Sequence, residues 1–252
     1  MTERINRVCQ IARNGFCGEL ELDTRFDRLN FKSMLDKLDK LFLLVQLECK
    51  DFFIAGGCLR DALIGKDYND IDVWAASQAD FEIFRDYLHI NQYSKTYDSK
   101  FAETYKKRQE NKAFIAWNTV QQRQSTSHKN AVQVIKSFAN QQEQFSDFII
   151  RTLTNFDFTI NQIAYQPAEE MIYVSQLFLE DVVNKKLRSQ NILNHSQFIL
   201  QRAKKFSLEG WMLHPELFAA LSKLPKDICS CGENHFESNH YIWTMKDAEE
   251  IA

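Results

Sequence analysis

Residues 54–74 read IAGGCLRDALIGKDYNDIDVW. One short apolar run, residues 52–55, leads into the glycine pair Gly56-Gly57, and a second apolar run, residues 71–75, follows further along. The two runs predict buried strands. The residues between them predict a short helix over 58–64, with Gly65 as its C-terminal cap. The segment therefore predicts a strand, a glycine turn, a helix and a second strand.

The polar residues of this segment have the types and the spacing of a phosphate-binding turn joined to a metal site. Because Gly56 and Gly57 have no side chains, their backbone can come close to a phosphate. Arg60 can donate two hydrogen bonds to a phosphate. Asp70 and Asp72 stand at i and i+2 of a strand, so both carboxylates leave the same face. Such a pair suits Mg²⁺, which takes its other ligands from substrate phosphate and water. We therefore expect Asp70 and Asp72 to hold Mg²⁺, with Mn²⁺ as an alternative.

The whole pattern, G-G-x-x-R-D-x-x-x-G-x-x-x-x-D-x-D, resembles the first motif of the poly(A) polymerase head domain. Class II tRNA nucleotidyltransferases (the CCA-adding enzymes) and bacterial poly(A) polymerases share that domain, and every signature position is filled here. The resemblance implies a polymerase-β-like nucleotidyltransferase fold. It also implies that Asp70 and Asp72 are catalytic and hold the metal, and that Gly57 and Arg60 contact a nucleoside triphosphate.

A second segment, residues 155–161, reads NFDFTIN and resembles the Arg-Arg-Asp-Phe-Thr-Ile-Asn motif of the same family. The match implies that Asp157 and Asn161 bind the nucleotide. An ordinary strand with alternating apolar residues is the competing interpretation, but it does not explain the polar partners. Residues 179–188 are a looser match to the segment that links head and neck in the family, and an ordinary amphipathic helix start fits them nearly as well.

The neck helix of the family carries Glu-Asp-x-x-Arg, whose charged side chains read the incoming base in CCA-adding enzymes. An alignment on Phe206 puts His195, Ser196 and Ile199 at these positions. Arg202 keeps a positive charge at a position that contacts nucleotide in the family, although simple surface charge explains it equally well. Because the base-reading residues are replaced, we do not expect ordered C-C-A addition.

Three further positions depart from the family. The two arginines of the second motif are replaced by Asn155 and Phe156. Catalytic domains of this superfamily usually add a third acid on a neighbouring strand, and the best candidate strand, residues 131–136, offers Gln133 there. These differences favour a degenerate module that binds without turnover, whereas the intact Asp70 and Asp72 oppose it.

The rest of the chain alternates helical and strand patterns and then becomes helical. The predicted helices cover residues 31–49, 58–64, 81–89, 141–153, 198–206 and 215–223. The predicted strands cover residues 52–55, 71–75, 113–120, 131–138, 160–166 and 171–175. The order predicts an α+β fold with a short helical C-terminal part. We expect an N-terminal extension over 1–30, a nucleotidyltransferase head domain over 31–178 and a neck-like helical region over 179–252.

Composition limits the setting. The longest apolar run, residues 41–47, is interrupted by Gln46 and is too short to span a membrane. No signal peptide is evident, and six scattered cysteines are expected to be reduced thiols. These features predict a cytoplasmic protein. The net charge is −3, so any contact with nucleic acid should be local.

Two other clusters carry weaker signals. Cys229, Cys231, His235 and His240 are four ligands suitable for a structural Zn²⁺, but only one residue separates the cysteines, and free thiols with surface histidines are the simpler interpretation. A run of positive charge in the polar middle segment could guide RNA or another polyanion, although such runs are more often solvated. The run comprises Lys95, Lys100, Lys106, Lys107, Arg108 and Lys112.

Taken together, the motifs predict an Mg²⁺-dependent enzyme that transfers a nucleoside monophosphate from a triphosphate to an acceptor hydroxyl and releases pyrophosphate. The family resemblance makes an RNA 3′ end, such as that of a tRNA, the first expected acceptor. Two alternatives stay open: nucleotidylation of a protein or small molecule, and a degenerate nucleotide-binding or protein-interaction module.

Overall fold

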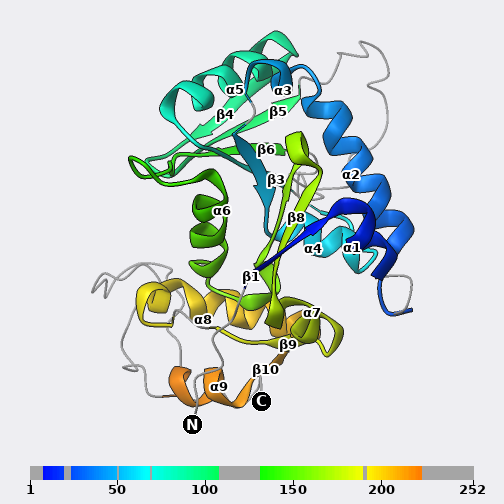
Figure 1. Ribbon diagram of the computed structural model, residues 1–252. Coiled ribbons are helices and arrows are strands. Elements are labelled where there is room, and N and C mark those ends of the chain that lie inside the picture. Colours follow the sequence, from blue (N-terminus) through cyan, green and yellow to red (C-terminus); the bar gives the residue numbers. More distant parts are fainter. Residues whose placement is uncertain are drawn as a thin grey trace, which may run out of the picture. The chain divides into compact units, whose positions relative to one another are not determined.

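The computed structural model describes residues 8–19, 24–49, 51–68, 70–107, 131–189 and 192–222, without the side chains of 192–198 (Figure 1). The chain forms two compact units. The sheet unit comprises Gln10–Ile150 and Ala164–Tyr173. The helical unit comprises Met1–Cys9, Arg151–Ile163 and Val174–Ala252. Each unit is described by itself below.

A mixed eight-stranded sheet organises the described residues, with the strand order β1-β8-β7-β2-β3-β6-β5-β4. β3 and β6 are parallel, whereas β2–β3, β2–β7, β4–β5 and β5–β6 are antiparallel. This mixture confirms the predicted α+β class. The strands are β1 Val8–Ala12, β2 Phe52–Ala55, β3 Asp70–Ala75, β4 Tyr93–Asp98, β5 Ala102–Lys107, β6 Ala131–Ile135, β7 Ile163–Gln166 and β8 Met171–Ser175.

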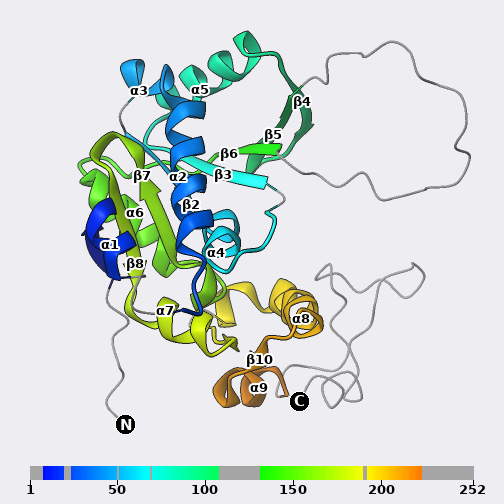
Figure 2. The same ribbon diagram turned by 90° about the vertical axis from the view of Figure 1, so that its right-hand side faces the viewer.

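Aromatic side chains pack helices onto both faces of this sheet. On one face lie α2 (Arg28–Phe42) and α5 (Gln78–Ile90) (Figure 2). There the rings of Phe42, Phe52 and Phe84 meet at 4.7–5.7 Å between centroids. On the other face, α6 (Phe145–Thr154) packs Phe148 against Phe53. Because buried aromatic pairs contribute both area and geometry, these contacts fix the core of the sheet unit.

The helix predicted over residues 31–49 is two helices. α2 begins after Asp27, whose carboxylate accepts the backbone N–H of Asn30 at 2.9 Å, and it ends at Phe42. The Tyr87 hydroxyl donates to the carbonyl of Leu41, an acceptor that a continuing helix would use. α3 (Val45–Glu48) follows as a separate turn. The single-helix prediction was therefore wrong at residues 43–44.

Several elements were not predicted from the sequence. β1 and α1 (Arg13–Glu19) lie in the part left unassigned, and β4 and β5 lie in the polar middle segment. Arg13 anchors α1, because its guanidinium binds the carboxylates of Asp36 and Asp39 in α2 and the Tyr165 hydroxyl in β7. The strand predicted over 113–120 lies outside the described residues.

The described part of the helical unit contains helices, a small parallel sheet and the 155–161 segment. The helices are α7 Gln176–Val183, α8 Ile192–Leu208 and α9 Pro215–Leu221, with Pro215 in the first turn as predicted. β9 (Lys186–Leu187) pairs with β10 (Met212–Leu213). No helix within the described ranges is long and apolar enough to cross a bilayer.

Candidate active site

The glycine turn follows directly from β2, as the sequence predicts. All four residues of β2 are buried, and the chain leaves them through Gly56, whose φ of 91° and ψ of −138° suit a residue without a Cβ. α4 (Gly57–Leu63) then begins, and Gly65 follows it at a φ of 69°. The strand–turn–helix prediction is confirmed, including the glycine after the helix.

Arg60 is buried against this turn. A Cβ placed on Gly57 would lie 3.5 Å from Nη2 of Arg60, so the guanidinium sits over the glycine. Nε and Nη2 of Arg60 contact the Oδ1 of Asp61 at 2.8 and 2.7 Å. The ion pair holds the guanidinium next to the glycine turn, which is the position that a phosphate-binding arginine needs.

The two aspartates lie on β3, beside the turn. Asp70 and Asp72 are half-buried and share one face of the strand. Cys58, in the first turn of α4, lies near Asp72: burial raises the pKa of its thiol, and the carboxylates of Asp72 and Asp70 raise it further. The packing of α4 on β3 thus brings the glycine turn and both carboxylates together in the sheet unit.

The residues present fit a divalent metal held partly by substrate. The parallel strand β6 places Gln133 directly opposite Asp72, the position where the superfamily usually has a third acid. Within the described ranges no group of three or more His, Cys, Asp or Glu side chains could hold a metal ion. Two carboxylates with a neutral neighbour suit Mg²⁺, which takes several ligands from phosphate and water.

Asp157, Asn161 and Arg202 form a second group, in the helical unit. Asp157 is 5% exposed, and its Oδ1 accepts the backbone N–H of Phe158 at 3.0 Å. The Asn161 amide lies 3.5 Å from the same oxygen, and the half-exposed guanidinium of Arg202 forms an ion pair with Oδ2. The structure therefore brings together the three residues that the second motif and the neck helix supplied.

The segment that carries Asp157 and Asn161 is held by a buried polar cluster. Thr159, within the 3₁₀ turn Thr159–Asn161, donates its hydroxyl to Asp181 Oδ2 at 2.6 Å. Arg188 donates to Asp181 Oδ1 at 3.1 Å. Asp181 and Arg188 belong to residues 179–188, the looser match to the segment that links head and neck. The hydroxyl of Thr159, which the sequence analysis did not single out, joins this segment to residues 155–161.

Other predicted positions are only partly described. Ile199 is apolar and fully buried in α8, so it cannot form a hydrogen bond with a base. The side chains of His195 and Ser196 lie outside the described residues, and so do Cys229, Cys231, His235 and His240 of the predicted zinc site.

Solved structures with a similar fold are CCA-adding enzymes. A CCA-adding enzyme in apo form I aligns with a TM-score of 0.54 at 15% identity, over 74% of this chain and 41% of that chain. A CCA-adding enzyme in complex with CTP gives 0.52 at 18% identity, over 76% and 45%. The Thermotoga maritima CCA-adding enzyme complexed with tRNA_CCA gives 0.51 at 16% identity, over 76% and 44%.

These likenesses show the fold alone: the chain has the nucleotidyltransferase head fold of the CCA-adding enzymes, as the motifs predicted. It spans less than half the length of those enzymes. No curated protein matches it. The family model of the Gabija anti-defense 2 family protein, Gad2, matches residues 25–185. Because this match covers more than half of the sequence, the chain belongs to the Gabija anti-defense 2 family.

Proposed function

We propose that this protein is a divalent-metal-dependent nucleotidyltransferase. The observation that carries the proposal is that β3, which holds Asp70 and Asp72, pairs within one unit with β2, the strand that leads into the Gly56-Gly57 turn and the helix of Arg60. A carboxylate pair beside a phosphate-binding turn is what the transfer of a nucleoside monophosphate needs.

In this proposal the sheet unit handles the phosphates. Asp70 and Asp72 would hold Mg²⁺, which when bound neutralises phosphate charge. Arg60 would donate to the triphosphate beside the backbone of Gly57. The oxygen of the acceptor hydroxyl forms a bond to the α-phosphorus, the bond from the α-phosphorus to the bridging oxygen breaks, and pyrophosphate leaves with the electron pair. The hydroxyl proton passes to water.

Asp157, Asn161 and Arg202, within the helical unit, are further residues that we propose to bind nucleotide. Asp157 offers carboxylate oxygens, Asn161 offers an amide and Arg202 offers guanidinium N–H groups, so the group can both accept and donate hydrogen bonds. Class II tRNA nucleotidyltransferases have charged residues at the positions that His195, Ser196 and Ile199 occupy here. We therefore do not propose ordered C-C-A addition.

An RNA 3′ end, such as that of a tRNA, is the first acceptor we propose, because the structural relatives include a tRNA complex. The family description favours a second acceptor, a component of the Gabija defence itself, which would be nucleotidylated on a protein hydroxyl. Gln133 opposite Asp72 favours a third role, binding of a nucleotide without turnover.

One assay separates these roles. The purified chain is incubated with each α-labelled nucleoside triphosphate, Mg²⁺ and a pool of small RNAs, and then with proteins of a Gabija system. We expect labelled RNA that is lost in Asp70→Asn and in Asp72→Asn. The matched control is Asp86→Asn, which removes a mostly exposed carboxylate that pairs with Arg85 on α5, and it should keep full activity.

If protein is labelled and RNA is not, the acceptor is a protein hydroxyl and not an RNA 3′ end. Triphosphate binding with no labelled product under any condition would overturn the enzyme proposal. Omission of Mg²⁺ with excess chelator should stop transfer, and Mn²⁺ should restore it.

A further inference from the structure

The polar row that starts at the aspartates continues across three more strands. Asp72 pairs with Gln133 in β6, Gln133 pairs with Thr104 in β5, and Thr104 pairs with Tyr97 in β4. Side chains at directly paired positions of neighbouring strands point to the same face of a sheet. Gln133, Thr104 and Tyr97 therefore share the face of Asp72.

A second row runs parallel to the first. Asp70 pairs with Ala131, and Ala131 pairs with Lys106 in β5, so Lys106 also stands on the aspartate face. Lys107, the next residue, stands on the opposite face. No ion pair joins Lys106 to another residue of the described ranges, and its side chain is half-buried.

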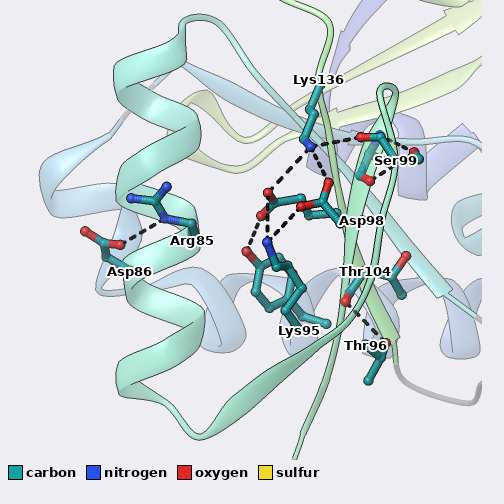
Figure 3. A network of polar contacts seen from close by, with 11 residues as sticks. Arg85, Asp86, Lys95, Thr96, Asp98, Ser99, Thr104 and Lys136 are labelled. Atoms are coloured by element: carbon teal, nitrogen blue, oxygen red, sulfur yellow. Dashed lines mark hydrogen bonds and ion pairs between the residues drawn. The ribbon is translucent and has the colours of Figure 1, made fainter.

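Two other lysines of this region, Lys95 and Lys136, form ion pairs with carboxylates on the opposite face, where α5 lies. Lys95 contacts Asp98 at 2.8 Å and Glu103 at 3.4 Å, and Lys136 contacts the same two carboxylates at 2.6 and 3.5 Å (Figure 3). The Tyr105 hydroxyl donates to Glu103, which completes the network. Lys106 is therefore the lysine of these strands whose charge faces the side of the aspartates.

The position of this row relative to the glycine turn matters for the direction of attack. The turn and Arg60 follow β2, which pairs with one edge of β3, whereas β6 pairs with the other edge. In an in-line displacement the attacking oxygen and the leaving pyrophosphate lie on opposite sides of the phosphorus. If the triphosphate lies toward Arg60, the acceptor approaches from the side of Gln133.

We propose that Gln133, Lys106 and Tyr97, around the buried Thr104, form the acceptor subsite and that this subsite takes the unpaired 3′ end of an RNA; the inference rests on the proposed function. Tyr97 is 64% exposed and can stack on a base, and Lys106 can contact a backbone phosphate. Three strand spacings separate Asp72 from Tyr97, about 14 Å, which is long enough for a terminal nucleotide and its neighbour.

Binding without triphosphate tests the subsite independently of catalysis. A 5′-fluorescein RNA hairpin with a single-stranded 3′ overhang is titrated with the full chain in Mg²⁺, and anisotropy is recorded at several salt concentrations. Lys106→Ala should weaken binding several-fold and reduce the slope of log affinity against log salt by about 0.7. Tyr97→Ala should weaken binding about tenfold and leave the slope unchanged.

Each variant has a matched control. Lys107→Ala removes the same charge from the opposite face of the same strand, and Phe101→Ala removes an aromatic ring that is 67% exposed in the β4–β5 turn and carries Lys100 over its face. Both should bind RNA like the wild type. Equal losses in Lys106→Ala and Lys107→Ala would overturn the subsite, and so would RNA binding that neither Lys106→Ala nor Tyr97→Ala changes.

The two proposals fail in different ways. One outcome is that no acceptor is labelled while Lys106→Ala weakens RNA binding and Lys107→Ala does not. This outcome would overturn the transferase proposal and support the subsite. Labelled RNA with unchanged binding in both subsite variants would support the transferase and overturn the subsite. Transfer to protein with no RNA binding at all would also overturn it.

Discussion

At the scale of single residues, Gly56 and Gly57 differ in backbone conformation although they are neighbours. Gly56 adopts a φ of 91°, a backbone conformation that L side chains rarely adopt, whereas Gly57 begins α4. Gly56→Ala should destabilise the fold by about 1–3 kcal/mol, because its backbone would be strained. Urea unfolding followed by circular dichroism measures this effect.

Gly57→Ala is the comparison for that experiment. Its added Cβ meets only the end of the Arg60 side chain at an ordinary 3.5 Å, so stability should change little. Equal losses in the two variants would contradict the strain argument at Gly56.

The carboxylate of Asp98 gives a prediction about protonation. Hydrogen bonds from Lys136 and Lys95 lower its pKa to about 2 from the ordinary 3.8. Because the folded pKa is depressed, the favourable contribution is present above pH 3.8 and is lost as the pH falls through 2. In Lys136→Met, an NMR titration of the Asp98 carboxyl carbon should show a pKa closer to 3.8; an unchanged value would contradict the pairing.

Residue types and spacing were enough to predict that Asp70 and Asp72 share one face of a strand, because a strand fixes the face on which i and i+2 lie. The sequence indicated Gln133 on a neighbouring strand, but only the structure shows that it pairs with Asp72. The ion pair of Arg60 with Asp61 was not predicted, since adjacent helical residues usually diverge and only the burial of α4 turns these two together.

At the scale of elements, α5 begins with the cap that its sequence indicates. The Ser77 hydroxyl oxygen accepts the backbone N–H of Asp80 at 3.1 Å. Ser77→Ala should lower the free energy of unfolding by about 1 kcal/mol, because one N–H of the first turn loses its partner. Chemical denaturation measures the loss. Ser77→Asp should retain most of the stability, and a loss as large as that of alanine would argue against capping.

The cluster around Asp181 links the 3₁₀ turn to α7 and β9, and its contribution should depend on pH. Burial raises the pKa of Asp181, and the Thr159 hydroxyl and the Arg188 charge oppose that rise. Because the pKa of Asp181 is raised in the folded protein, its contribution to stability is fully present below pH 3.8. This contribution is lost as the pH rises through the pKa of the folded protein.

The stability advantage of wild type over Asp181→Asn should therefore be larger at pH 4 than at pH 7. Urea unfolding at both values measures the difference, with Asp86→Asn as the exposed control. An advantage that does not change with pH would contradict the burial argument.

The helices and strands whose apolar residues follow a clear pattern were predicted from the sequence, and those without such a pattern were not. β2 matched its predicted bounds, because four consecutive apolar residues can only be buried. β4 has no buried residue and lies at the sheet edge, so its sequence shows no alternation of polar and apolar residues. α1 contains Gly15 and Gly18, which weaken any helical pattern. These two elements are set by tertiary contacts such as those of Arg13.

At the scale of the whole molecule, the chain enters and leaves both units more than once. It passes between them after residues 9, 150, 163 and 173. The predicted boundaries at 30 and 178 remain predictions, and a fragment ending at 178 tests the second one. That fragment would lack Asp181, Arg188 and Phe206, the last of which packs on Phe158 at 5.5 Å.

We expect fragment 1–178 to be cleaved much faster by protease around residues 155–161 than fragment 1–222, because the partners of Thr159 and Phe158 are missing. Limited proteolysis with mass spectrometry measures the rates. Equal protection in both fragments would support an autonomous head domain that ends at 178.

The interleaving of the two units also bears on how the protein is made. A ribosome releases residues 151–163 long before α8, yet Asp157 of this segment pairs with Arg202 of that helix. The pairing of Asp157 with Arg202 therefore has to wait until α8 has been translated, while the glycine turn and the aspartates can assemble earlier. A nascent chain stalled before α8 would carry the residues proposed to bind phosphate and metal but would lack Arg202, which belongs to the group proposed to bind nucleotide.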